Sequence, residues 1–221
     1  MRWQSCIMIG LLLACSEAAA SATPPLAPTE APPSGIERVA GKSWSFGASA
    51  YTYLVSHDQD YVQPTFTADR GQLHLEARYN YEDLQTGSTW IGWNLGAGES
   101  LVLEFTPIAG LVLGATRGIA PGYKGSLSWR KLELYSEGEH VFGTADASDS
   151  FFYNWSQLTI APWAWSEFGV VIQRTRAYES ERELQRGLLL GFSRKGASLS
   201  AIVFNPDTEE PTTVIALALT F

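Results

Sequence analysis

The chain has 221 residues and a formal net charge of −8, with 45% apolar and 12% aromatic residues but only 17% charged residues. The charged fraction is below the roughly 25% of an ordinary soluble domain. The acidic balance argues against a nucleic-acid partner, because phosphate binding needs a basic stripe and Lys and Arg cluster here only in pairs.

The first residues indicate an export signal. Arg2 precedes the apolar run 7–14, which is too short to span a bilayer. Two processing routes are open. Cleavage after Ala22, at a small-x-small site, makes residues 1–22 a signal peptide; alternatively, the stretch ending in Cys15 resembles a bacterial lipoprotein box, and the leader is then 1–14 with Cys15 lipidated.

Residues 23–42 are rich in Pro, Ala, Thr and Ser and cannot bury a core, so we expect a flexible tether that leads to one domain over 43–221. Both cysteines, Cys6 and Cys15, precede that domain, which therefore holds no internal disulfide and no Cys-based metal site. We assign no cofactor and no metal ligand. No later stretch approaches eighteen consecutive apolar residues, so no transmembrane helix is expected.

The rest of the chain alternates large apolar and polar side chains with a period of two, which predicts an all-β fold. About twelve antiparallel strands are expected, at 44–55, 61–69, 72–82, 88–96, 99–107, 110–118, 124–136, 150–160, 164–177, 184–194, 197–205 and 212–221. Because segment boundaries are approximate, 10 or 14 strands are also compatible with the pattern.

Short and long connections tend to alternate along the chain. Short turns are predicted at 69–71, 96–98, 109–110 and 194–196, and longer, more acidic loops at 56–60, 83–87, 138–149, 178–183 and 206–211. This alternation is typical of an up-and-down meander with short turns at one rim and long loops at the other. Many Trp and Tyr residues fall near predicted strand ends or flanks, where a membrane barrel carries an aromatic belt. The residues assigned to this belt are Trp44, Tyr51, Tyr53, Tyr79, Tyr81, Trp90, Trp93, Trp129, Tyr135, Tyr153, Trp155, Trp163 and Trp165.

The last strand has large apolar side chains at alternate positions, Ile215, Leu217, Leu219 and Phe221. Such an ending resembles the closing strand of bacterial outer-membrane β-barrel proteins. The resemblance implies a single transmembrane barrel in the bacterial outer membrane, contact with outer-membrane lipids and lipopolysaccharide, and recognition of the last strand by the barrel-assembly machinery. It leaves the oligomeric state open.

Polar residues on the opposite strand faces are the candidates for the lumen wall. They are His74, Glu76, Arg78, Asn80, Glu104, Arg130, Glu133, Glu167, Gln173, Thr175 and Arg186. Along 124–136 the apolar residues change parity, and a bulge near Arg130 and Lys131 would reconcile them. The size is similar to that of small twelve-stranded porins for acidic oligosaccharides, whose lumens are strongly basic; this chain has no comparable Arg excess.

We favour a narrow passive channel or structural barrel with a mixed-charge lumen, and two alternatives remain. The first is an outer-membrane lipid-modifying hydrolase on twelve strands, which needs a Ser and His pair. The chain has only His57, His74 and His140 and no G-x-S-x-G motif, so we assign no catalytic residue. The second is a lipid-anchored periplasmic barrel or sandwich that binds a small ligand and turns its apolar faces inward.

Overall fold

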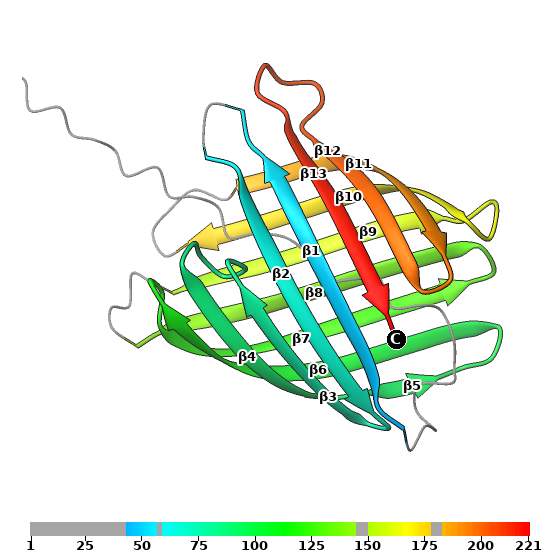
Figure 1. The fold of residues 1–221 in the computed structure, drawn as a ribbon, viewed down its shortest axis with the longest axis horizontal. Coiled ribbons are helices and arrows are strands. Elements are labelled where there is room, and N and C mark those ends of the chain that lie inside the picture. The colour runs from blue at the N-terminus through cyan, green and yellow to red at the C-terminus, as the bar shows by residue number, and fades with distance from the viewer. Residues whose placement is uncertain (1–42, 57–58, 145–149, 178–182) are drawn as a thin grey trace, which may run out of the picture.

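The computed structural model describes residues 43–56, 59–144, 150–177 and 183–221, and these residues form one antiparallel sheet that closes on itself (Figure 1). The expected leader, Cys15 and the tether over 23–42 lie outside the described residues, as does His57. Within the part that is described, no helix has the length and hydrophobicity needed to cross a membrane.

The described residues contain thirteen strands. They are β1 (Ser45–Leu54), β2 (Tyr61–Arg70), β3 (Leu73–Tyr79), β4 (Thr86–Trp93), β5 (Leu95–Ala97), β6 (Leu101–Gly114), β7 (Gly118–Trp129), β8 (Leu132–Gly143), β9 (Phe151–Ile160), β10 (Ser166–Ala177), β11 (Glu183–Arg194), β12 (Ala197–Phe204) and β13 (Thr212–Thr220). Only Asn94 separates β4 from β5, and both pair with β6. They therefore act as one interrupted strand, and the barrel is twelve-stranded, as the sequence predicts.

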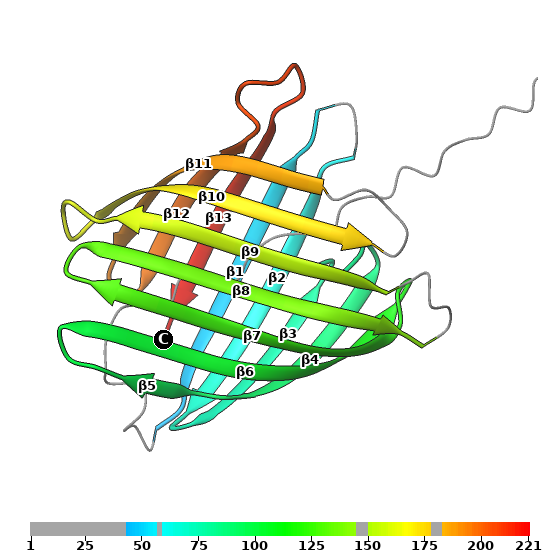
Figure 2. The same cartoon turned by 180° about the vertical axis from the view of Figure 1, so that it is seen from behind.

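The first and last strands close the barrel. β1 and β13 pair antiparallel from Gly47↔Thr220 to Leu54↔Thr213. The backbone N–H groups of Phe46 and Phe221 each donate to the other's carbonyl, at 2.8 and 2.9 Å. Figure 1 shows this seam in front, and Figure 2 shows the wall from β6 to β11 behind it. Closure gives the edge strands partners, which an apolar membrane interior requires.

Two of the predicted strand boundaries are wrong, in opposite directions. Segments 99–107 and 110–118 were separated by an expected turn at 109–110, but β6 runs through that position. Conversely, the expected single strand 124–136 contains a two-residue hairpin turn, because Trp129 pairs with Leu132 and Arg130 takes a positive φ of 56°. The parity change seen in the sequence thus comes from a turn, not a bulge, and the two errors cancel in the strand count.

The connections separate into two rims. The connections β2–β3, β5–β6, β7–β8, β9–β10 and β11–β12 lie at the same end of the barrel as Phe221, and we call this end the short-turn rim. The opposite end, the long-loop rim, carries the connections over 80–85, 115–117 and 205–211; β1, β8 and β10 end there, and β2, β9 and β11 begin there. The predicted alternation of loop lengths is wrong at two places: the 115–117 connection is brief, and residues 138–143 of the loop expected over 138–149 belong to β8.

Burial is inverted relative to a soluble barrel. Large apolar side chains along every full-length strand are exposed on the outer face, for example Phe66, Leu111 and Leu188, whereas charged side chains such as Glu76 and Arg78 are buried inside. A continuous apolar exterior is stable only against lipid. The apolar faces therefore point outward, contrary to the periplasmic alternative, which needs them inside.

The aromatic residues divide between the two faces. Trp44, Trp93, Trp129, Trp163 and Trp165 are exposed, and all five lie at or beside the short-turn rim, as expected of an interfacial belt. Seven other Trp and Tyr residues assigned to that belt from the sequence are instead buried in the lumen: Tyr51, Tyr53, Tyr81, Trp90, Tyr135, Tyr153 and Trp155. A strand pattern alone does not separate these cases, because aromatic side chains suit either face of a sheet.

Candidate functional site

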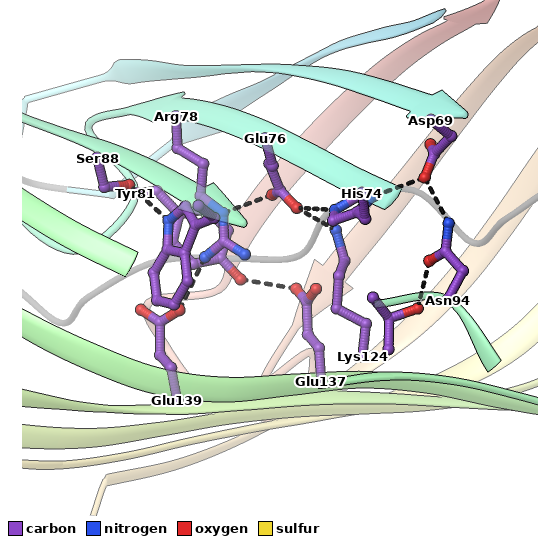
Figure 3. A network of polar contacts seen from close by, with 12 residues as sticks. Asp69, His74, Glu76, Arg78, Tyr81, Ser88, Asn94, Lys124, Glu137 and Glu139 are labelled. Carbon is purple, nitrogen blue, oxygen red and sulfur yellow. Dashed lines mark hydrogen bonds and ion pairs between the residues drawn. The ribbon is translucent and has the colours of Figure 1, made fainter. Parts of the chain in front are cut away.

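The middle of the lumen is crossed by a set of buried polar contacts, which we call the bridge network. Its members are Asp69, His74, Glu76, Arg78, Tyr81, Glu82, Ser88, Lys124, Tyr135, Glu137 and Glu139. Figure 3 shows Glu76 and Arg78 reaching from one wall toward Glu137 and Glu139 on the other. In the sheet order, β4, β6 and β7 separate β3 from β8, so these contacts span the lumen.

Strand β3 supplies the charged side of the bridge network because its pleat directs alternate residues inward. His74, Glu76 and Arg78 are each at most 6% exposed, while Leu75 and Tyr79 face lipid. His74 contacts Asp69 through Nδ1 at 2.8 Å and Glu76 through Nε2 at 3.0 Å. The imidazole therefore links two carboxylates.

Arg78 is the central cation. Its Nε donates to Glu76, and its Nη1 donates to Glu139 across the lumen at 2.8 Å and lies 3.7 Å from Glu82. The guanidinium also lies over the Tyr81 ring, 4.1 Å from its centroid, and over the Trp90 ring at 4.4 Å. Planar guanidinium groups suit such combined ion-pair and stacking sites. Arg78 thus joins three carboxylates and two rings in one cluster.

Two further contacts cross the lumen beside Arg78. Lys124, on β7, donates to Glu76 at 2.7 Å. The Tyr81 hydroxyl group donates to Glu137 on the opposite wall at 2.6 Å, while the Tyr135 hydroxyl group, on the same strand as Glu137, orients that carboxylate by donating to it at 2.7 Å. Charge-assisted hydrogen bonds of this length are stronger than neutral ones, so they hold the two walls together.

The connection 80–85 folds into the lumen because of Asn80. This residue takes a positive φ of 56°, which Asn tolerates better than most residues. Its side chain donates to the Val62 carbonyl at 3.1 Å and accepts from the Gln85 N–H at 2.8 Å. By strand parity Tyr81 would face outward like Tyr79, but the turn reverses its direction, and Tyr81 and Glu82 are buried inside. Burial raises the pKa of the Glu82 carboxyl group in this connection, and Arg78 opposes that rise.

Aromatic side chains fill the lumen toward the long-loop rim. Trp155 and Phe204, from β9 and β12, are both completely buried and meet edge-to-face with centroids 5.5 Å apart. Tyr81 and Tyr153 form a second edge-to-face pair at 5.8 Å. Such pairs pack as in a protein core. We call Tyr51, Tyr53, Tyr81, Trp90, Tyr153, Trp155 and Phe204 the aromatic layer.

The half of the lumen toward the short-turn rim is polar and less tightly filled. Glu104, Glu133 and Glu167 point inward there and are partly exposed. Ser126 donates to Glu104 at 3.4 Å and Ser128 donates to Glu133 at 3.2 Å. These three predicted carboxylates thus lie on β6, β8 and β10, in the half of the lumen between the bridge network and the short-turn rim. Gln173 and Thr175 are buried inside the lumen on β10, nearer the long-loop rim.

Three predicted lumen residues do not line the lumen. Arg130 lies exposed in the β7–β8 turn, where the hairpin directs it away from the barrel. Arg186 is on the outward parity of β11 and pairs at 3.4 Å with Asp207 in the next loop, with about two thirds of each side chain exposed. Asn80 ends β3 and holds the turn described above.

Most side chains of the far wall are absent from the predicted lumen set. Lys124 lies in the expected strand 124–136, whose turn at 130–131 was not recognised. Glu137 and Glu139 lie beyond that strand, beside and within the loop expected over 138–149, but β8 continues to Gly143 and directs both inward. The sequence does contain a polar alternation that could have indicated the inward face. Once a turn is placed at 130–131, Ser126, Ser128 and Glu133 lie on the same face as Lys124. Which residues meet across a lumen depends on the stagger between strands, and that stagger is not local in sequence.

The bridge network has five carboxylates, Asp69, Glu76, Glu82, Glu137 and Glu139, against two permanent cations, Arg78 and Lys124. If all five carboxyl groups are ionised and His74 is neutral, the formal excess is three negative charges, and the raised pKa of Glu82 makes the excess smaller. A ring of excess carboxylates favours cations over anions. Among the described residues, no group of three or more His, Cys, Asp or Glu side chains is arranged to hold a metal ion.

Together, the closed twelve-stranded sheet, the apolar exterior and the polar lumen define a membrane β-barrel of the porin type. No protein-family model and no curated protein sequence matches the chain. Among solved structures, the chain is similar to the KdgM porin, with a TM-score of 0.59 and 9% identity over 79% of this chain and 99% of the porin.

The KdgM porin in complex with disordered oligogalacturonate matches with the same values. The OccK5 structure from Pseudomonas aeruginosa gives a TM-score of 0.45 and 8% identity, over 81% of this chain and 67% of that one. At 9% identity the likeness to KdgM shows the fold alone. This chain has the fold of an outer-membrane porin barrel of twelve strands.

Proposed function

We propose that the protein is an outer-membrane barrel whose lumen is closed at rest by the bridge network and the aromatic layer, and which passes small cations at most. The observation that carries this proposal is the direct contact between opposite walls, Arg78 with Glu139 and Tyr81 with Glu137. We infer that side chains in such contact narrow the lumen too far for a sugar to pass. The short-turn rim then faces the periplasm, as in other bacterial barrels.

The charge of the lumen supports small cations rather than acidic oligosaccharides. Oligogalacturonate, the ligand in the KdgM complex, is a polyanion, and its carboxylates would meet the excess carboxylates of the bridge network here. Like charges in a low-dielectric lumen repel strongly. We therefore do not transfer that ligand to this chain.

Liposome swelling tests the proposal. Proteoliposomes with the wild-type protein are expected to swell in isotonic arabinose no faster than protein-free liposomes, while a double variant that opens the bridge network, Arg78→Ala with Tyr81→Ala, swells faster. The matched control is Arg186→Ala, because Arg186 lies on the outer face. Rapid swelling with the wild-type protein would show that sugars pass and would refute the closed state.

A purely structural barrel is the second candidate, and the completely buried aromatic pair Trp155 and Phe204 favours it. The same experiment separates the two candidates. If the double variant swells no faster than the wild type although it is folded, the aromatic layer seals the lumen even without Tyr81, and the structural candidate replaces the channel.

A further inference from the structure

A shallow groove lies on the outer, lipid-facing surface beside the short-turn rim. It has a volume of about 320 Å³, and Trp165, Phe192, Leu199 and Leu217 form its apolar part. Phe192 pairs with Leu199 across β11 and β12, and Leu199 pairs with Leu217 across β12 and β13, so the groove runs over three adjacent strands. All four side chains are about half exposed.

One side of the groove is a rigid aromatic wall. The Trp165 and Phe192 rings are stacked with centroids 5.9 Å apart and an interplanar angle of 5°. Trp163 extends the stack, 5.7 Å from Trp165. A stacked wall of this kind loses little side-chain entropy when a flexible chain packs on it.

The end of the groove at the rim is cationic. Arg194 lines it and Lys195 follows in the β11–β12 turn, where its positive φ of 51° belongs to the tight hairpin. Within the described ranges, neither side chain takes part in an ion pair. Two unpaired cations therefore stand at the point where the apolar groove meets the aqueous interface.

The same arrangement recurs around the rim, which shows that the charge is not confined to one turn. Arg70 lies over the Trp44 ring at 5.8 Å and Arg130 lies over the Trp129 ring at 4.9 Å. The described part of the long-loop rim instead carries an acidic run, with Asp207, Glu209 and Glu210 in its last loop. Among the described residues, the paired Arg and Trp side chains at the short-turn rim suit anionic headgroups better than this acidic loop does.

We propose that this groove is a binding site for a phospholipid with an anionic headgroup. The headgroup phosphate pairs with Arg194 and Lys195, and an acyl chain lies along Leu199 and Leu217 against the Trp165 and Phe192 wall. Charge complementarity at the rim and an apolar seat below it fit this occupant, because each end of the groove matches one end of the lipid. The site is on the opposite face of the wall from the lumen and is independent of the proposed closed state.

Native mass spectrometry of the detergent-purified protein tests the proposal. We expect the wild type to retain phosphatidylglycerol several-fold more than phosphatidylcholine, since only the former carries a net negative charge. The double variant Arg194→Gln with Lys195→Gln is expected to lose that preference. Arg186→Gln, which removes an exposed arginine at the other end of β11, is the matched control and is expected to retain it.

A second variant tests the apolar part of the site. Ala197 lines the groove on the outward face of β12, so Ala197→Trp fills the groove and leaves both cations in place. It is expected to lower retention of phosphatidylglycerol several-fold. Heat-modifiable migration on unboiled gels confirms that each variant is folded.

Three outcomes would overturn the proposal. Equal retention of both lipids by the wild type means no headgroup selection. Unchanged retention in Ala197→Trp means that the cations bind headgroups without the groove. A wild-type dimer that Ala197→Trp dissociates means that a second copy of the chain, rather than a lipid, covers this face.

Discussion

Arg78 is the residue on which the bridge network depends. Its guanidinium contacts Glu76, Glu82 and Glu139, so replacing it leaves three buried carboxylates without their shared cation. Removing one partner of a buried ion pair typically costs about 3–5 kcal/mol. We therefore expect Arg78→Ala to lower the free energy of unfolding by about that amount, as measured by urea unfolding of the barrel in lipid vesicles.

Arg186→Ala is the matched control for Arg78→Ala, because it removes an arginine whose ion pair is exposed. The pair that Arg186 forms with Asp207 is solvent-exposed, and such pairs contribute about 0–1 kcal/mol. Arg186→Ala is expected to unfold at nearly the same urea concentration as the wild type. If the two variants unfold alike, the contacts of Arg78 contribute nothing to stability and the bridge network is not a structural unit.

Asn80 fixes the conformation of the connection 80–85. Its backbone needs a positive φ, and its side chain makes two hydrogen bonds that close the turn. Asn80→Gly keeps the backbone conformation and loses both bonds, whereas Asn80→Ala loses both and adds backbone strain of about 1 kcal/mol. We expect hydrogen exchange over 80–86 to become faster in the order wild type, Asn80→Gly, Asn80→Ala.

Asn205 provides the comparison for this element, since it also has a positive φ and holds a loop through its side chain, which accepts from the Arg186 N–H at 3.1 Å. Asn205→Ala is expected to speed exchange over 205–211 and to leave 80–86 unchanged. Faster exchange of 80–86 in this variant would mean that the loops move together, and that Asn80 does not hold its connection independently.

Arginine substitutions at two positions along β13 test whether this strand spans the membrane. Ile215 faces lipid near the middle of the strand and pairs with Thr52 and Ala201, while Thr213 faces the same way close to the long-loop rim. Ile215→Arg is expected to cost about 2–4 kcal/mol and Thr213→Arg about 0–1 kcal/mol, because water and headgroups reach the rim. The measurement is refolding into vesicles at increasing urea. Equal costs would contradict a membrane-spanning β13.

At the scale of the molecule, local patterns predicted the architecture well. The alternation over 73–79 suffices to put His74, Glu76 and Arg78 on one face, since the pleat has a period of two. The ending at Phe221 resembles the closing strand of outer-membrane barrels, and the closed barrel which that resemblance implies is confirmed by the pairing of β13 with β1. The turn at Arg130 and Lys131 contains no Gly, Pro, Asn or Asp, so the residue types do not indicate a turn. The predicted strand therefore runs through the hairpin.

The contents of the lumen were harder to predict, because they depend on which strands face each other. Glu139 lies 61 residues from Arg78 in the chain, and nothing local to either indicates their contact. Buried aromatic residues such as Trp155 look the same in sequence as the exposed Trp165. The distinction arises only when the strand stagger and the barrel diameter decide which side chains have room inside.

Single-channel recording in planar bilayers tests the closed lumen most directly. We predict that the wild-type protein gives no steps, or steps far smaller than those of KdgM in the same salt, and that Arg78→Ala with Tyr81→Ala gives larger, cation-selective steps, because the contacts with Glu139 and Glu137 are then gone. Steady wild-type steps as large as those of KdgM would contradict the account, since a lumen bridged by these side chains does not conduct like an open porin.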